Sequence, residues 1–205
     1  LLHEHLRRLA QADLVRPSLS GDGDEYAFRH ALTRDAAYGT ILIRQRRRYH
    51  RRVAEAMESL YAERLPEEAP QLAWHYIEAL DWARAIRYCA MAGAAAARLY
   101  ANVEAIEHYS RALEIARANP SAVDDAGLTD IFHRLGRVYE VAGQPDNALR
   151  AYQTLEQLGA ERDNPTLQLE GLMPQVALFV TPTPFMDAAR GREHAERLMA
   201  LGEQL

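Results

Sequence analysis

His30 has the clearest position for chemistry in this sequence, because it lies where an extended segment gives way to a helix. Phe28-Arg29-His30 ends a stretch of β character, and the residues after it have helical spacing. A histidine at such a junction can donate to a phosphate, and the first backbone N–H groups of the helix supply further donors. The residues leave open the alternative that His30 merely caps or packs at the edge of a domain.

A cluster of arginines is the second candidate site. Residues 29–52 carry a net charge of about +7, so the rest of the chain carries about −12. Such a cluster can bind phosphate or nucleic acid. On a helix, however, the side chains point in several directions, and Glu55 and Glu58 lie within reach of Arg51 and Arg52. We therefore expect a solvated face that also forms an interface, made of Arg44, Arg46, Arg47, Arg48, Arg51 and Arg52.

Catalytic and metal-binding patterns are missing from the sequence. The eight histidines are scattered, no His-Glu-x-x-His occurs, and Cys89, the single cysteine, is expected in the core. Asp124-Asp125 should cap a helix, and Glu67-Glu68 should favour the first turn of another. The chain has no lysine, which excludes a Gly-Lys-Ser/Thr phosphate loop within it. We expect neither an enzyme, even one with a diffuse site, nor a metal site in these residues.

The composition is that of an acidic globular protein. The 205 residues carry a net charge of −5, with a pI near 5.9, which argues against a dedicated nucleic-acid binder. No apolar run approaches the roughly 18 residues of a membrane helix, and the lone cysteine fits a reducing cytoplasm. The sequence starts at Leu1 without Met and within a helical pattern. We interpret it as a piece of a longer cytoplasmic protein without a membrane partner.

The elements that would position these residues are mostly helices. Before residue 44, a helix with Leu2, Leu6 and Leu9 on one face precedes two short strands, in a hairpin at about 14–30. Thr33 should cap the helix that follows. Pro174 should kink or break the helix that contains it. Breakers place the later helices near 44–62, 67–79, 82–99, 103–117, 125–142, 145–159, 165–180 and 185–203.

One stretch matches the tetratricopeptide repeat, a hairpin of two antiparallel helices. It reads Phe132-x2-Leu135-Gly136-x2-Tyr139-x3-Gly143-x4-Ala148-x3-Tyr152. A second copy lies 43 residues earlier, where Gly, Ala and Tyr recur at the same offset. The spacing predicts a repeat core made of Gly93, Ala105, Tyr109, Phe132, Leu135, Gly136, Tyr139, Ala148 and Tyr152. Such repeats build concave binding surfaces, and at a hairpin tip Tyr100 and Asn102, together with Trp74, are candidate groove residues.

The N-terminal motifs resemble the winged-helix segment of STAND-type signalling ATPases. They are Tyr26-x-Phe28-Arg29-His30-Ala31-Leu32-Thr33-Arg34-Asp35-Ala36-Ala37-Tyr38 and Arg46-Arg47-Arg48-x-His50. Leu72-Ala73-x-His75-Tyr76 is similar to the start of the family's helical sensor. Members include adenylate/guanylate cyclase-like proteins and large LuxR-type regulators. The resemblance implies that His30 contacts the phosphates of ATP or ADP held by the ATPase core of the parent chain, and that this segment holds no cofactor itself.

These observations predict an all-α protein in two parts. Residues 1–62 would form a winged-helix remnant with a β-hairpin, and residues 63–205 a tetratricopeptide-like superhelix of antiparallel hairpins. The expected function is that of a sensor arm, in which a protein or small ligand in the groove acts on the parent ATPase. Two alternatives remain open: a plain scaffold for a protein partner, and a DNA-binding winged-helix regulator. We do not expect DNA as the partner. An unfinished end of the superhelix would allow pairing with another copy.

Overall fold

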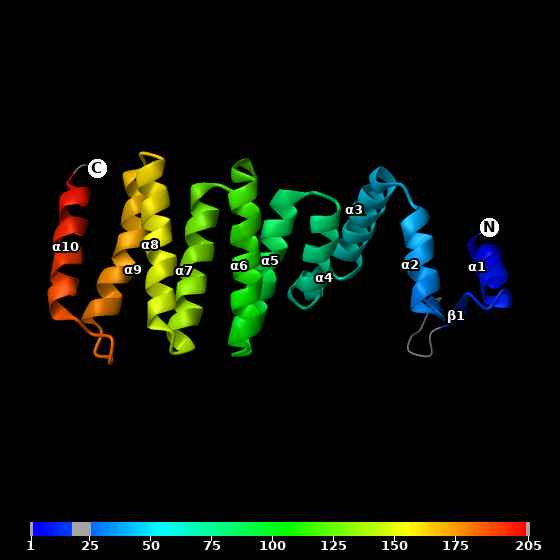
Figure 1. Ribbon diagram of the computed structural model, residues 1–205, viewed down its shortest axis with the longest axis horizontal. Helices are drawn as coiled ribbons and strands as arrows, with labels where there is room; N and C mark the ends of the chain where they lie inside the picture. Colours follow the sequence, from blue (N-terminus) through cyan, green and yellow to red (C-terminus); the bar gives the residue numbers. More distant parts are fainter. Residues whose placement is uncertain (1, 18–25, 204–205) are drawn as a thin grey trace. The chain divides into compact units, whose positions relative to one another are not determined.

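The computed structural model describes residues 2–17 and 26–203, in which it contains ten α-helices and one two-stranded hairpin (Figure 1). The predicted all-α class is confirmed. The chain divides into two compact units, Leu1–Arg48 and Tyr49–Leu205. This division falls within helix α3, Ile43–Leu60. One continuous helix therefore belongs partly to each unit.

The N-terminal unit has the expected order of helix, strand, strand, helix. β1 and β2 pair antiparallel, with Val15 opposite Phe28 and Pro17 opposite Tyr26. The expected loop between them, residues 18–25, lies outside the described residues. The elements before α3 are α1 (Leu2–Gln11), β1 (Val15–Pro17), β2 (Tyr26–Phe28) and α2 (Ala31–Thr40).

Helix α2 begins earlier than the sequence indicated. We expected Thr33 to cap it, but its N-cap is His30, whose side chain makes no capping hydrogen bond. The backbone N–H of Thr33 already donates to the carbonyl of His30, at 3.1 Å. Because Ala31 and Leu32 tolerate helical geometry, the helix extends back to the end of the strand. Thr33 thus lies in the first turn.

The C-terminal unit is a row of helices that pack against their sequence neighbours. Figure 1 shows α5 to α10 side by side, each antiparallel to the one before. Two 3₁₀ turns, Ala62–Arg64 and Pro120–Ala122, interrupt the row. After α3, the helices are α4 (Leu65–Glu78), α5 (Trp82–Arg98), α6 (Asn102–Ala118), α7 (Asp125–Val141), α8 (Pro145–Glu161), α9 (Pro165–Val180) and α10 (Ala188–Gly202).

Four of the tight turns between these helices share one geometry. In each, a residue with positive φ follows the helix, and the next N–H donates to the carbonyl five residues back. This is the Schellman arrangement, which satisfies carbonyls at the end of a helix. Three of the four left-handed residues are not glycine, although only glycine adopts this geometry without strain. The left-handed residues are Leu80, Tyr100, Gly143 and Asp163.

The two repeat copies pack in the same way. A Cβ on Gly136 would lie 2.2 Å from a ring carbon of Tyr152, and a Cβ on Gly93 would lie 3.0 Å from the ring of Tyr109. Each glycine therefore makes room for the tyrosine of its own hairpin. The Tyr152 hydroxyl donates to Glu140 at 2.6 Å, which holds the ring in place. The other repeat-core residues, Ala105, Phe132, Leu135 and Ala148, are buried, and Tyr139 is half-buried.

Helix α9 is continuous through Pro174, so the predicted break is wrong. Proline has no N–H for the carbonyl of Glu170, four residues earlier. That carbonyl instead accepts a hydrogen bond from His133 Nε2 on α7, at 2.7 Å. In the same helix, a Cβ on Gly171 would lie 2.3 Å from the backbone nitrogen of Glu156. The glycine and the replacement hydrogen bond thus let α9 continue through Pro174 while it packs against α7 and α8.

Two hydrophobic clusters lie in the described part of the C-terminal unit: a large one with buried residues from α3 to α9, and a smaller one of Leu149, Leu178 and Phe179. The largest fully buried side chains of the unit include Tyr76, Tyr88, Tyr109 and Phe179, and Cys89 is buried in the large cluster, as expected. Helix α10 exposes Met199, which is 62% exposed, together with five charged residues: Arg190, Arg192, Glu193, Glu196 and Arg197. Pairing with another copy stays a prediction.

Candidate functional site

A cavity of about 520 Å³ lies between three consecutive helices of the C-terminal unit. Its floor is apolar and includes Leu128, Phe132 and Leu135 of α7, all buried. Leu113 of α6 and Leu158 of α8 extend this surface. A largely apolar cavity of 300–1,000 Å³ with a few polar groups is typical of a site for a small ligand.

Helical periodicity explains why one cavity collects these residues. Apart from Ala116, the lining positions on α6 are 110, 113, 114 and 117, and those on α8 are 154, 157, 158 and 161. Both sets have the spacing i, i+3, i+4, i+7, which places their members on one face of a helix. The two faces form opposite walls over α7, and the polar members, Ser110, Glu114, Arg117, Thr154, Gln157 and Glu161, line the rim.

The charged rim residues differ in their pairing. Arg162, also at the rim, forms an ion pair with Asp125, and Glu114 pairs with Arg111 at 3.0 Å. Glu161 accepts a hydrogen bond from Gln157 Nε2 at 2.9 Å. For Arg117, no hydrogen bond or ion pair joins its guanidinium to any other described residue. A guanidinium has five N–H donors, so Arg117 has the largest unused capacity for binding at the rim.

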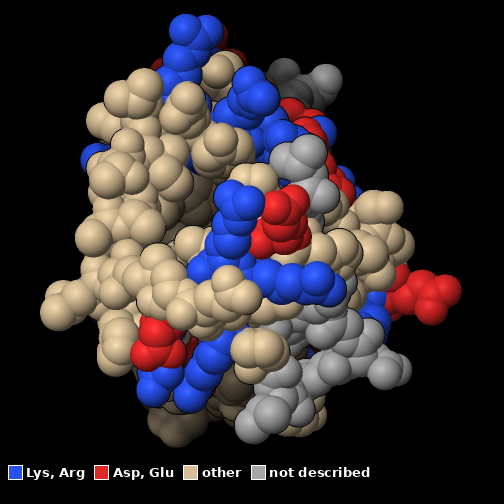
Figure 2. Space-filling model, turned by 90° about the vertical axis from the view of Figure 1, so that its right-hand side faces the viewer, with Lys and Arg blue, Asp and Glu red and all other residues tan. Residues whose placement is uncertain are grey.

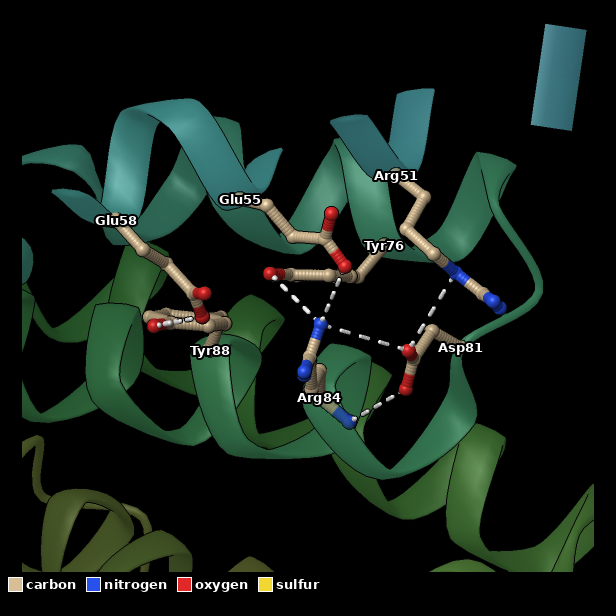
Figure 3. A network of polar contacts seen from close by, with 7 residues as sticks. All are labelled: Arg51, Glu55, Glu58, Tyr76, Asp81, Arg84 and Tyr88. Atoms are coloured by element: carbon tan, nitrogen blue, oxygen red, sulfur yellow. Dashed lines mark hydrogen bonds and ion pairs between the residues drawn. The ribbon is translucent and has the colours of Figure 1, made fainter. Parts of the chain in front are cut away.

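A network of polar contacts joins α3 to α4 and α5 (Figure 3). At its centre, the Arg84 guanidinium lies 3.3 Å from Glu55, 3.4 Å from the Tyr76 hydroxyl and 3.9 Å from Asp81. The sequence suggested instead that Glu55 and Glu58 pair with arginines of α3. Both turn towards α5, because its Arg84 and Tyr88 offer partners. The network consists of Arg51, Glu55, Glu58, Tyr76, Asp81, Arg84 and Tyr88.

The tyrosines of this network have altered acidity. Tyr88 donates to Glu58 at 2.5 Å, and its ring stacks on Tyr76 with centroids 5.5 Å apart. Burial, with help from the Glu58 carboxylate, raises the pKa of Tyr88 to about 12. The same causes raise the pKa of Tyr76 well above its usual value. Both hydroxyls are therefore protonated at neutral pH: that of Tyr88 donates to Glu58, and that of Tyr76 accepts from Arg84.

Two histidines form a second link between α3 and α4. His50 Nδ1 lies 3.0 Å from His75 Nδ1, so one nitrogen carries the shared proton and the other accepts it. The Trp74 ring packs edge-on against both imidazoles. Burial lowers the pKa of both histidines, and the neighbouring His50 lowers that of His75 further. The neutral forms are thus favoured in the folded protein.

His30 lies, as expected, at the junction of a strand and a helix. Its side chain is exposed, and its backbone is extended at the N-cap of α2. The nearby Arg29 forms an ion pair with Asp13. This position leaves the imidazole and the first N–H groups of α2 available to an anion. No contact within the described residues assigns His30 a role.

The arginine cluster has a more regular arrangement than the sequence suggested. Because α3 is continuous, five of the six arginines lie on one face at i, i+3, i+4, i+7 and i+8. Arg46 lies opposite and donates to the carbonyls of Gly39 and Ile41 at the end of α2. Arg51 lies 3.9 Å from Asp81. In Figure 2, groups of basic side chains on the face in view have acidic ones among them. The remaining exposed set, Arg44, Arg47, Arg48 and Arg52, is called the arginine stripe below.

The expected groove residues do not line the cavity. Trp74 packs on the two histidines, and Tyr100 is 79% exposed in the turn between α5 and α6, beside the first residue of α6, Asn102. Sequence reasoning missed the rim, including Arg117 and Glu161. A usable signal existed, because residues 102–118 and 145–161 carry polar side chains at matching helical spacing beside leucines. That signal also needs the packing order of three helices.

Other classes of site find little support in the described part of the chain. No group of three or more His, Cys, Asp or Glu side chains there is arranged to hold a metal ion. Asp124 accepts from the N–H of Gly127 at 2.8 Å and caps α7, as expected.

Among the described helices, none combines the length and apolar character that crossing a membrane requires.

Comparison with known proteins gives no relative: no family model, no curated protein and no solved structure matches the chain.

Proposed function

We propose that the C-terminal unit is a tetratricopeptide-like binding arm, and that the cavity between α6, α7 and α8 receives its ligand. The cavity carries this proposal, because it joins a buried apolar floor to a polar rim on three helices held by the core. The paired Gly–Tyr contacts and the shared turns support the assignment to this class of repeat. A binding arm needs no catalytic constellation.

The arm would act within a larger ATP-dependent signalling or transcription regulator. The resemblance of residues 26–53 to the winged-helix segment of STAND-type ATPases supports this part of the proposal. There, His30 would contact nucleotide phosphates, and the arginine stripe would face the ATPase core of the same parent chain. ATP or ADP would belong to that core.

Helix α3 is the element through which ligand binding would reach the N-terminal unit. Its C-terminal half is bound to α4 and α5 by the contacts of Glu55, Glu58 and His50. Its N-terminal half carries most of the arginine stripe. A ligand that prefers one arrangement of the arm over another would change the free energy of the coupled states.

The binding part can be tested with a variant that fills the cavity. Thr154 is an exposed rim residue on α8, so Thr154→Trp should occupy the cavity without disturbing the core. Thermal denaturation of both proteins over a panel of peptides and small molecules should reveal a ligand that raises the Tm of the wild type alone. If no compound raises the Tm of the wild type more than that of Thr154→Trp, the cavity is not the binding site.

The regulator part has a separate test. The coding sequence upstream of Leu1 should contain Gly-x4-Gly-Lys-Ser/Thr, followed by a strand that ends in acidic residues. In that parent protein, His30→Ala should weaken nucleotide binding and raise basal activity. If His30→Ala keeps wild-type nucleotide affinity, the coupling is wrong, and a plain scaffold for a protein partner becomes the better description.

A further inference from the structure

We infer that the cavity between α6, α7 and α8 takes a small organic anion with an apolar body, and that Arg117 binds its anionic group. This inference rests on the proposed binding arm and adds the class of its ligand. Two observations carry it: the apolar floor, and the distribution of charge partners around the rim.

The floor selects an apolar body. Leu128, Phe132 and Leu135 leave no polar side-chain atom at the bottom of the cavity, so a polar group placed there would lose its hydrogen bonds to water. Phe132 adds an aromatic ring to this surface, and aromatic groups pack well against such rings. The part of the ligand that enters deepest must therefore be hydrocarbon, aliphatic or aromatic.

The rim selects the sign of the charged group. Of its two cations, Arg162 is already bound to Asp125, whereas Arg117 has no partner among the described residues. Of its two anions, Glu114 is paired with Arg111, and Glu161 accepts from Gln157. An incoming ammonium would meet carboxylates that already accept from Arg111 and Gln157, and it would be repelled by the unpaired positive charge of Arg117. A carboxylate or sulfonate would instead supply the acceptor that the Arg117 guanidinium lacks, with the bidentate geometry that this group favours.

The size of the cavity limits the ligand to a small molecule. About 520 Å³ holds an organic molecule of drug-like size or smaller. The floor residues Leu128, Phe132 and Leu135 are only 4–6% exposed, which is too little surface to hold the apolar face of a whole partner helix. The anion is therefore a small amphiphile and not the apolar face of a protein.

The test uses three probes that share one naphthalene body and differ in head group. They are 2-naphthoate, 2-naphthylmethylammonium and 2-naphthalenemethanol, titrated into the full chain by isothermal calorimetry. We expect 2-naphthoate to bind at least about tenfold more tightly than the ammonium probe. Equal or tighter binding of the ammonium probe would overturn the inference, and so would the absence of 2-naphthoate binding.

Variants assign the binding to Arg117. Arg117→Gln should weaken 2-naphthoate binding about tenfold and leave 2-naphthalenemethanol unchanged. Arg98→Gln is the matched control, because Arg98 lies in the last turn of α5 as Arg117 does in α6, but outside the cavity. If Arg117→Gln and Arg98→Gln behave alike, the assigned anchor is wrong.

A filled cavity separates this inference from the proposed function. Thr154→Trp should abolish binding of all three probes, with Gln157→Trp as a second filled variant if the first does not keep the wild-type circular dichroism. If 2-naphthoate does not bind but a peptide or neutral compound stabilises the wild type and not the filled variants, the anionic ligand is wrong and the binding arm stands. If 2-naphthoate does not bind and no compound distinguishes the wild type from the filled variants, both the anionic ligand and the binding arm are wrong.

Discussion

The two units of this chain obtain their stability in different ways. In the C-terminal unit, each helix from α4 to α10 buries side chains against its neighbours, and most belong to one continuous core. In the described N-terminal unit, Val15 is the one buried hydrophobic side chain, and α2 buries none. Polar contacts such as Arg29 with Asp13, and Arg46 with the end of α2, hold that unit instead.

The comparison shows that a regular helix is not evidence of local stability. Exposed ion pairs contribute little, because solvent screens them, whereas burial of large side chains contributes strongly. Several apolar residues of the N-terminal unit remain exposed, including Leu32, Leu42 and Ile43. We therefore expect the C-terminal unit to be the more rigid of the two.

Amide hydrogen exchange should give the largest difference between the units. Amides of α2 should exchange on the order of 1,000-fold faster than those in the middle of α7, since opening α2 exposes almost no buried surface. Native-state exchange followed by mass spectrometry measures this ratio. Equal protection in both helices would break the comparison.

Two glycines, one in each unit, allow the stability of the two units to be compared by single substitutions. Gly136→Ala should lower the free energy of unfolding by about 2–4 kcal/mol, because the new methyl group would overlap the Tyr152 ring, which Glu140 holds in place. Gly39→Ala in α2 meets no atom within 4 Å, so it should be neutral or stabilise α2 by up to about 1 kcal/mol. Urea denaturation followed by circular dichroism compares the two variants. A mild Gly136→Ala would mean that the ring can move aside.

The contact between Tyr88 and Glu58 should contribute about 1–2 kcal/mol at neutral pH, which Tyr88→Phe removes. The same contact should also affect how the free energy of unfolding decreases at alkaline pH. Folding raises the pKa of Tyr88 to about 12 from roughly 10 in the unfolded chain, so it favours the protonated hydroxyl. This stabilisation is complete below pH 10 and is lost as the pH rises towards 12.

Urea midpoints of Tyr88→Phe between pH 8 and pH 12 should therefore fall less than those of the wild type. Tyr100→Phe is the control, because its hydroxyl lies on an exposed turn. A parallel decline of Tyr88→Phe and the wild type would exclude the contact as a source of alkaline sensitivity.

The histidine pair should give the smallest effect, at acid pH. Burial lowers the pKa of His50 and His75, so folding favours their neutral forms. Their stabilisation is present above about pH 6.5, the value of an unfolded histidine, and decreases as the pH falls below it. His75→Gln should flatten the decline in unfolding free energy between pH 7 and pH 5, whereas His108→Gln on α6 should not. If the unfolding free energy of His75→Gln falls between pH 7 and pH 5 as steeply as that of the wild type, the histidine pair does not contribute to this pH dependence.

Much of the helical arrangement could be predicted from the sequence, because breakers mark the ends of helices. Pro145, Pro165 and Asp81 each lie at or beside the start of a helix, within a few residues of the expected position. The spacing also predicted that Gly136 and Tyr152, and Gly93 and Tyr109, belong to the core, and the structure shows that each pair is in contact. Pro174 misled the prediction, because its compensating partner, His133, lies 37 residues away from the carbonyl it binds.

The candidate site was less accessible to prediction. The partners of Glu55 and Glu58 lie about 30 residues further on, and only the packing of α3 on α5 brings them together. The cavity depends likewise on how far α6 and α8 stand apart over α7. Periodicity indicates the face of a helix on which a residue lies, but it does not fix the distance between two walls. Tyr100 was a candidate because it is an aromatic residue at a turn, whereas much of the apolar lining of the cavity consists of leucines.

The turns after α5 and α7 have one further consequence. Their left-handed residues, Tyr100 and Gly143, lie 43 positions apart, the same interval that separates the two glycines and the two tyrosines of the repeat. A stretch of 43 residues therefore begins and ends in a turn of the same backbone geometry. Duplication of such a stretch in the gene would add one helical hairpin and leave the turns on both sides unchanged. The length of the C-terminal unit could then change during evolution without any change in the residues that line the cavity.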